Sequence, residues 1–463
     1  MRLKLVLPPD WHWGCVALFC LLVSCCGGGG GGGSTVLPSP PTISLNASPT
    51  ALSFGQSCTL SWTAANTTSV TISGLNSSFA SSGTTSVSPT VTTTYIATAT
   101  GPGGAATSSQ TVTVTGVWTS AASMNAVRSV HVAVLLQSGK VLDVGAIGGT
   151  NDAVSGDIYD PANNLWSATG GLGLTSGLLF HTMTMLNNGK VLLVGTGYDF
   201  SISMPKSVAL LYDSQTNSWA ITGTPLVGAT LNHAAVLLAD GNVLLGGGDS
   251  AYQSPVSAYL FNPQSGTWSV TGSMNVGRSF HTFTLLPSGK VLASGGLGGS
   301  TARTSCELFD PATGKWTSTG NLNVGRYRHT ATLLSNGKVL VVGGVVNESG
   351  SGLASTEIYD PTTGQWMPTG TMTLGRSGHS ASVLANGTVL VAGGGVSPTP
   401  SPQAELFDPS IGLWSTTGSM GSARNKHTAI TLPNGNILVA GGNVLYQGGP
   451  STTASSSAEL YIP

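Results

Sequence analysis

The sequence predicts an all-β fold in two parts, a small β-sandwich and then a ring of seven four-stranded units that an N-terminal strand closes. Three observations predict it. Charged residues are only 7% of the 463 residues, against about 25% in an ordinary globular domain. Short β-rich runs alternate with Gly, Asn, Ser and Pro turns from about residue 42 onward. After residue 116, a pattern centred on a histidine recurs seven times.

Composition excludes several classes of protein. The formal net charge is −1, which leaves no basic surface for nucleic acid. Hydrophobic residues make up 40% of the chain, which excludes disorder driven by charge. The charges are unevenly placed, because residues 11–127 contain none. Low charge with abundant Gly, Ser and Thr favours an extracytoplasmic β protein.

The first 24 residues are predicted to be a signal peptide. Arg2 and Lys4 precede an apolar run at residues 14–23 that is too short to span a bilayer. The run ends in Leu-Val-Ser-Cys, which resembles a bacterial lipoprotein signal. The resemblance implies cleavage before Cys25, a lipid on its sulfur, and a membrane-anchored protein facing the periplasm or the cell exterior. An ordinary secretory signal or a different start codon are the alternatives, because Pro8 and Pro9 interrupt the segment.

Residues 25–41 are predicted to be a tether, and residues 42–116 a β-sandwich. The tether contains seven consecutive glycines and then a stiffer stretch with prolines. In the sandwich, the period of two places Cys58, Leu60 and Trp62 on one buried face. The segment resembles bacterial Ig-like modules, but Ala97 stands where an antibody-type domain has its second cysteine. We therefore expect Cys58 to be an unpaired buried residue, and the module to be a spacer or a weak glycan- or wall-binding domain.

Residues 117–463 contain the sevenfold repeat. Each unit has a histidine, a glycine eight residues later that opens a Gly-x-Val/Ile-Leu run, and an aromatic residue further on. The histidines are His131, His181, His233, His281, His329, His379 and His427. In the first six units a tryptophan follows the aromatic residue by seven positions. The last unit has no such tryptophan, whereas Trp118 precedes the first histidine and belongs to no unit.

This mismatch predicts how the ring closes. The period of about 49 residues gives each unit four short strands, which cannot bury both faces alone and must pack radially. Pairing the Trp118 segment with the last unit would remove the open edges. The spacings resemble the kelch family over residues 117–463, which implies a seven-bladed kelch β-propeller. The absence of Trp-Asp dipeptides excludes WD40 repeats.

Candidate ligand-binding residues lie where the units differ or where charges enter the central channel. Variable loops between strands two and three, and the links between units, are expected on one face. An arginine also stands three residues before five of the histidines and enters from this side. The candidates are Arg128, Tyr198, Asp199, Lys206, Asp249, Tyr252, Arg278, Arg326, Tyr327, Arg328, Arg376, Arg424, Lys426 and Tyr446.

The sequence favours binding over catalysis. Some secreted kelch propellers resemble galactose oxidase, a copper enzyme with two tyrosine and two histidine ligands and a tyrosine cross-linked to cysteine. Here the one propeller cysteine, Cys306, and all the histidines occupy repeat positions, so we predict no metal and no cofactor. We expect a monomeric, envelope-anchored, non-catalytic propeller that binds a glycan or a protein. A copper radical oxidase and a purely structural envelope protein are the alternatives.

Overall fold

The computed structural model describes residues 37–463, apart from residues 76, 146–155, 175–177, 200–203, 224–230, 249–254, 348–350, 397–398 and 446–451. Within these residues the chain forms strands β1 to β42 and no helix. No part of the described chain is therefore a helix long and apolar enough to cross a membrane. The predicted signal peptide and Cys25 lie outside the described residues.

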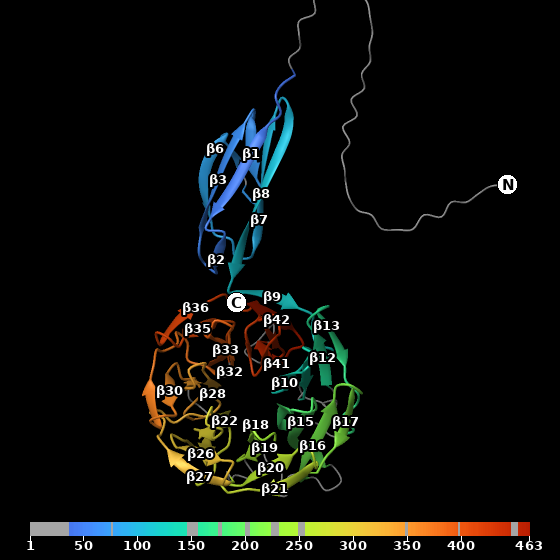
Figure 1. Ribbon diagram of the computed structural model, residues 1–463, viewed down its shortest axis with the longest axis vertical. Helices are drawn as coiled ribbons and strands as arrows, with labels where there is room; N and C mark the ends of the chain where they lie inside the picture. The colour runs from blue at the N-terminus through green and yellow to red at the C-terminus, as the bar shows by residue number, and fades with distance from the viewer. Residues whose placement is uncertain are drawn as a thin grey trace, which may run out of the picture.

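The N-terminal strands form two sheets that share one core (Figure 1). One sheet has the order β1-β3-β6 and the other β2-β8-β7-β4-β5. The strands are β1 (Thr42–Ser48), β2 (Ala51–Ser53), β3 (Cys58–Ala65), β4 (Ser69–Ile72), β5 (Ser78–Phe79), β6 (Ser82–Val87), β7 (Thr93–Gly101) and β8 (Gly104–Thr115). Cys58, Leu60 and Trp62 are at most 5% exposed, so the predicted buried face is confirmed. Cys58 is a free thiol.

The remaining strands form a ring of antiparallel sheets around a central opening (Figure 1). In the described residues, seven sheets share the same order of four strands, and we number them units one to seven. Units one to three contain β10 (Val132–Leu135), β11 (Val141–Val144), β12 (Gly156–Asp160), β13 (Leu165–Ala168), β14 (Leu179–Met185), β15 (Val191–Asp199), β16 (Met204–Asp213), β17 (Ser218–Ile221), β18 (Ala234–Leu237), β19 (Val243–Gly246), β20 (Ala258–Asn262) and β21 (Thr267–Val270).

Units four to seven follow the same plan. They contain β22 (Thr282–Leu285), β23 (Val291–Ser294), β26 (Cys306–Asp310), β27 (Lys315–Thr319), β28 (Thr330–Leu333), β29 (Val339–Val342), β30 (Thr356–Asp360), β31 (Gln365–Pro368), β32 (Ser377–Val383), β33 (Val389–Val396), β35 (Ala404–Asp408), β36 (Leu413–Thr416), β38 (Thr428–Thr431), β39 (Ile437–Ala440), β42 (Ala458–Ile462) and β9 (Val117–Ala121). The first strand of each unit lines the opening and the fourth lies at the perimeter (Figure 1).

The repeated aromatic residues hold each unit together and connect it to the unit before. In unit four the rings of Phe309 and Trp316 lie 5.0 Å apart, and equivalent pairs recur around the ring. The Trp316 indole N–H also donates to the Gly272 carbonyl, at 2.8 Å, just beyond the last strand of unit three. In five of the seven units the tryptophan thus links its unit to the preceding one at the perimeter.

Strand β9 closes the ring, as the position of Trp118 predicts. It pairs with β42 from Val117↔Ile462 to Ala121↔Ala458. Gly116 joins β8 of the sandwich directly to β9, and its N–H donates to Ile462 O at 2.7 Å. Its φ is +74°, and a Cβ there would lie 2.8 Å from Thr417 Oγ1. Glycine is therefore required at this junction, which leads into β9 at one end of the ring and bonds Ile462 at the other.

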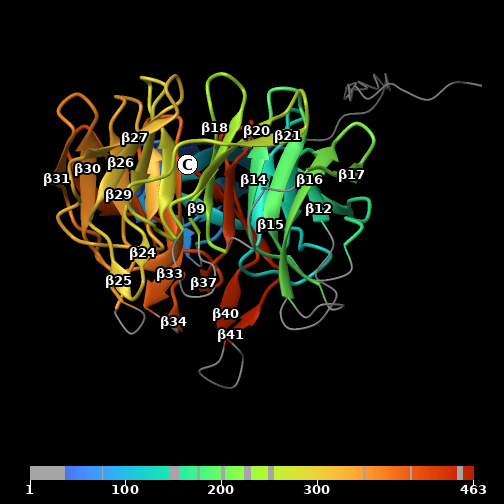
Figure 2. The same ribbon diagram turned by 90° about the horizontal axis from the view of Figure 1, so that it is seen from below.

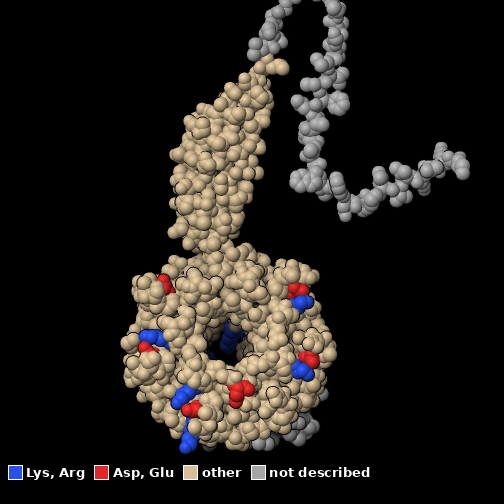
Figure 3. Space-filling model, in the orientation of Figure 1, with Lys and Arg blue, Asp and Glu red and all other residues tan. Residues whose placement is uncertain are grey.

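The two faces of the ring differ. One face carries the short turns, where lysine–aspartate ion pairs such as Lys338–Asp360, 2.9 Å between Nζ and Oδ2, appear as blue and red pairs around the rim (Figure 3). The opposite face carries the loops between strands two and three. There β24 (Leu297–Gly298), β25 (Thr301–Ala302), β34 (Thr399–Pro400), β40 (Asn443–Leu445) and β41 (Thr452–Ala454) project on one side (Figure 2). We call this side the loop face.

Candidate functional site

Five of the predicted ligand-binding arginines are buried ion-pair partners. Each is 0% exposed and pairs with the third-strand carboxylate of its own unit; Arg376 Nη2, for example, lies 2.6 Å from Glu405 Oε1. The five pairs are Arg128–Asp157, Arg278–Glu307, Arg326–Glu357, Arg376–Glu405 and Arg424–Glu459. Because these guanidiniums are out of reach of a ligand, the prediction is corrected for the five arginines. Their role is structural.

The two units that lack the arginine also lack the carboxylate. Unit two has Leu178 and Leu210 at the two positions, both fully buried in one apolar cluster. Unit three has the buried Tyr259 at the carboxylate position, and its arginine position, Thr230, lies outside the described residues. Unit two therefore lacks both members of the ion pair. This is expected, because a single buried charge without its partner is costly.

The repeated histidines connect neighbouring units at the inner edge of the ring. In each unit the residue directly after the histidine is usually Thr or Ser. Its hydroxyl bonds a ring nitrogen of the histidine in the next unit. Thr330 Oγ1 lies 3.0 Å from His379 Nε2, and Thr428 Oγ1 lies 3.3 Å from His131 Nε2 across the closure of the ring. Burial, together with the neighbouring arginine charge, lowers the pKa of His131 and of His379 to about 3. These histidines are therefore neutral structural groups.

The two units without a hydroxyl at this position show what it does. Val132 and Ala234 occupy the position in units one and three. His181, which follows unit one, bonds the Val144 carbonyl instead, at 2.9 Å. His281, which follows unit three, has no hydrogen-bond partner for either ring nitrogen among the described residues. Without the hydroxyl, therefore, one histidine bonds a backbone carbonyl and the other has no partner among the described residues.

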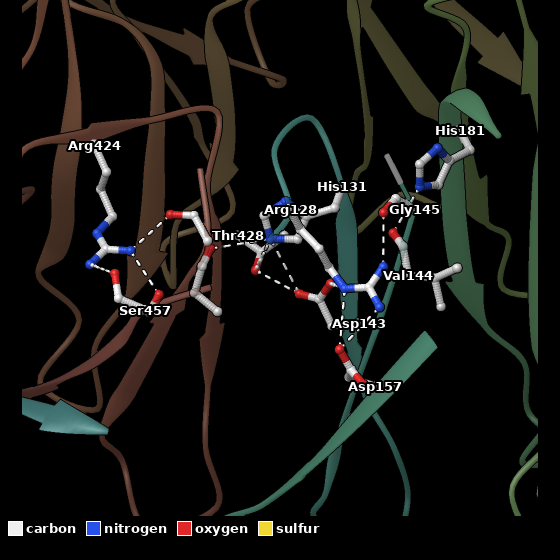
Figure 4. A network of polar contacts seen from close by, with 12 residues as sticks. Arg128, His131, Asp143, Val144, Gly145, Asp157, His181, Arg424, Thr428 and Ser457 are labelled. Carbon is white, nitrogen blue, oxygen red and sulfur yellow. Dashed lines mark hydrogen bonds and ion pairs between the residues drawn. The ribbon is translucent and has the colours of Figure 1, made fainter. Parts of the chain in front are cut away.

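Unit one contains an additional buried carboxylate, Asp143 (Figure 4). The other units have Leu, Ala or Val at the equivalent position. Asp143 is fully buried, 3.8 Å from Arg128 Nε and 3.3 Å from His131 Nε2, and it accepts a hydrogen bond from Thr428. Burial raises the pKa of Asp143 to about 7, although the Arg128 charge opposes the shift. Asp143 and Arg128 are fully buried, whereas His131, at the inner end of the network, also lines the axial cavity.

A ring of residues, each immediately before a strand-one histidine, surrounds the axis. In the described chain six of them have φ between 53° and 63°. Their backbones form a partial hydrogen-bonded ring, in which Lys426 N donates to Gly378 O at 2.7 Å and Phe280 N donates to Asn232 O at 3.0 Å. Left-handed non-glycine residues are uncommon and gather at functional sites. We call this set the axial collar: Val130, Phe180, Asn232, Phe280, Arg328, Gly378 and Lys426.

Six residues of the axial collar, all except Phe180, line a cavity of about 470 Å³, together with residues from the loop face such as Asn425 and Asn443. The predicted residues Arg328 and Lys426 both lie in it, and basic surface is visible inside the central opening (Figure 3). The Arg328 guanidinium carbon stacks 4.5 Å from the centre of the Phe280 ring. The Lys426 side chain is exposed, but its pKa is lowered. The main cause is partial removal of its ammonium group from water, and the second is repulsion by the Arg328 charge. Arg328 and Lys426 thus form the cationic part of a cavity that asparagines, apolar residues and the repeated histidines also line.

The other predicted residues do not enter this cavity or lie outside the described residues. Tyr327 is fully buried, with its ring 5.5 Å from the Arg328 guanidinium carbon. The backbones of Tyr198, Asp199 and Lys206 belong to the extended β15–β16 hairpin, but their side chains lie outside the described residues. Asp249, Tyr252 and Tyr446 also lie outside them. Ligand binding by these loop residues stays a prediction.

The described residues do not fit a copper centre of the galactose oxidase type. The Cys306 thiol is buried, its pKa is raised to about 11 by burial, and Sγ lies 3.5 Å from the Thr304 carbonyl. The histidines are held at equivalent positions between units. Among the described residues no group of three His, Cys, Asp or Glu side chains could hold a metal ion. We derive no redox step from the fold.

Comparisons with known proteins support this description of the fold. A family model for the KLHDC2/KLHL20/DRC7 Kelch-repeats domain matches residues 180–395. A solved structure of a novel fungal alcohol oxidase of the AA5 family, in complex with copper, is similar over 75% of this chain and 76% of its own. Its TM-score is 0.61 and its sequence identity 18%, which shows likeness of fold alone. No curated protein matches the chain. The chain has a kelch-like propeller fold.

Sequence reasoning missed the axial collar as a set. The collar position holds six different residue types in the seven units, although an unvarying histidine follows it directly. In chain order the residues are Val, Phe, Asn, Phe, Arg, Gly and Lys. That contrast distinguishes the position from the repeated structural positions around it. The structure adds that six of the seven residues, all except Phe180, line one cavity.

Proposed function

We propose that the protein is a non-catalytic receptor of the bacterial cell envelope that binds a glycan or a protein ligand in the axial cavity. In this proposal units one to seven are the blades of a seven-bladed kelch propeller. Residues 42–116 are an Ig-like spacer, and a lipid on Cys25 anchors a monomeric protein to the membrane. The lipoprotein-like signal, the uncharged sandwich and the glycine tether support this arrangement.

The observation that carries the proposal is the axial collar. At the neighbouring position the units repeat one residue, a histidine that in most of them bonds a hydroxyl or a carbonyl, whereas the collar places different side chains around one opening. The cavity of about 470 Å³ is within the usual range of about 300–1,000 Å³ for ligand sites. A few polar groups among apolar ones suit selective binding.

Two variants on opposite faces test the proposal. The full-length protein is screened against a glycan array and against envelope proteins, beside Phe280→Ala, which alters the cavity, and Lys290→Ala, which removes an exposed lysine of the turn face. We expect the wild type and Lys290→Ala to retain the same ligand and Phe280→Ala to lose most of it. Retention of nothing by the wild type, or equal retention by Phe280→Ala, would contradict the proposal.

A further inference from the structure

We infer that the axial cavity is a subsite for an acidic sugar, whose carboxylate is bound between Arg328 and Lys426. The inference rests on the proposed function and names the class of its ligand. It follows from three features of the cavity: two cations without a carboxylate partner among the described residues, a gap between them, and amide groups around them.

The two cations differ from the charges at repeated positions. The strand-one arginines and four turn lysines are ion-paired, as in Arg376–Glu405 and Lys338–Asp360. For Arg328 and Lys426, by contrast, no carboxylate lies within ion-pair distance among the described residues. Among the described residues, the Arg328 guanidinium carbon lies over the rings of Phe280 and Tyr327, 4.5 and 5.5 Å from their centres. An anion between the two side chains would supply the missing charge.

Gly378 leaves space for that anion. It is the collar residue of unit six, so it lies between Arg328 of unit five and Lys426 of unit seven. With φ of +63° it adopts the same backbone conformation as its neighbours, but it carries no side chain. A Cβ there would lie 3.4 Å from Lys426 Cγ, in the space between the units. The gap in the collar therefore coincides with the cationic side of the cavity.

The remaining lining favours a sugar over a peptide. Asn232, Asn425 and Asn443 bring three carboxamides to the cavity, and Asn425 Oδ1 is buried without a hydrogen-bond partner. Carboxamides both donate to and accept from hydroxyl groups. Val130 and Phe280 add apolar surface for C–H groups. A ring with one carboxylate, several hydroxyls and apolar faces matches this set, and uronic acids have that chemistry.

Titration calorimetry of the full-length protein with oligogalacturonate and oligoglucuronate, beside neutral galactose and glucose oligomers of equal length, tests the inference. We expect an acidic oligomer to bind and its affinity to fall with added salt. Arg328→Gln and Lys426→Gln should each weaken binding about 10-fold or more, since charge-assisted bonds are the strong ones. Lys338→Gln, on the turn face, should leave affinity unchanged.

Gly378→Asn is the independent test of the gap. Asn232 has φ of 58° at the equivalent position, so asparagine suits the backbone while its side chain fills the space. We expect a folded protein with at least 10-fold weaker binding of the acidic oligomer. Equal binding by Gly378→Asn would overturn the placement of the carboxylate.

The outcomes separate this inference from the proposed function. Binding of neutral and acidic oligomers with equal affinity, lost in Phe280→Ala, would overturn the acidic class and leave the receptor proposal standing. Preference for a peptide carboxylate, or equal competition by inorganic sulfate, would overturn the sugar assignment. If no glycan and no envelope protein binds, both proposals fail.

Discussion

The buried ion pair between Arg376 and Glu405 should be replaceable as a pair but not in halves. Arg376 Nη2 lies 2.6 Å from Glu405 Oε1, and the side chains are 0% and 2% exposed. Burial lowers the pKa of Arg376, whereas the Glu405 charge raises it. Removing one partner leaves a buried charge without its counter-ion, which costs about 3–5 kcal/mol. We therefore expect a large destabilisation from either Arg376→Leu or Glu405→Leu.

The double variant Arg376→Leu/Glu405→Leu should be far more stable than either single one. Unit two already has this solution, since Leu178 and Leu210 occupy the same positions in its core. Replacing a buried pair by apolar residues is often neutral or stabilising by about 1–4 kcal/mol. The coupling free energy between the two sites should therefore reach about 3 kcal/mol or more, at the upper end for residues in contact.

Urea unfolding followed by circular dichroism measures the four corners of this double-mutant cycle. The comparison is made at constant m-value, so that a change in midpoint reports stability. A reciprocal control uses unit two, where Leu178→Arg alone should destabilise and addition of Leu210→Glu should recover part of the loss. If the double variant is as unstable as the sum of the single ones, the two charges do not act as a pair and the argument is wrong.

Three further predictions concern the buried polar groups. The free energy of unfolding should be highest above about pH 6.5 and fall towards pH 3 by up to about 1.4 kcal/mol per pH unit for each histidine. The reason is that the folded-state histidine pKa values are about 3 to 4, whereas unfolded histidine binds protons near pH 6.5. Melting temperatures across this range measure the effect, and a flat profile would contradict it. Ala234→Thr should stabilise by about 1 kcal/mol by giving His281 a hydroxyl partner, whereas Thr330→Val should cost about 1–3 kcal/mol by leaving His379 without one; urea midpoints compare the two, and the same sign for both would disprove the role of the hydroxyl. Asp143→Val should raise stability more at pH 8 than at pH 4, since a raised pKa of about 7 means that the stabilising protonated form is lost as pH rises from about 4 to 7; a larger gain at pH 4 would reverse the assignment.

Much of the fold follows from local patterns, which the structure confirms at particular residues. The period of two places Cys58, Leu60 and Trp62 in the sandwich core. The unclaimed Trp118 predicts the pairing of β9 with β42, because tryptophan marks the perimeter strand of every other unit. Both predictions succeed because the pattern is repeated or strictly periodic, so tertiary packing can satisfy it in only one way.

The candidate site could not be obtained in the same way. Arginines entering a central channel suggest recognition, and only the structure shows that Arg376 turns into the sheet toward a carboxylate 29 positions later. The partner could have been inferred, since arginines and third-strand carboxylates occur in the same five units. The convergence of Arg328, Gly378 and Lys426 requires the closed ring, because it depends on backbone positions from three separate units.

The ring separates the residues that stabilise it from those that can vary. Tryptophans such as Trp316 join the units at the perimeter, and histidines such as His379 join them near the axis, and both links recur in most of the units. The collar residue stands next to the histidine, but its left-handed backbone directs its side chain to the cavity rather than to the link. A substitution at Arg328 or Lys426 should therefore alter the charge of the cavity without breaking a bond between units. In a chain with 7% charged residues, Arg328 and Lys426, whose charges have no carboxylate partner among the described residues, are the ones most available for a ligand.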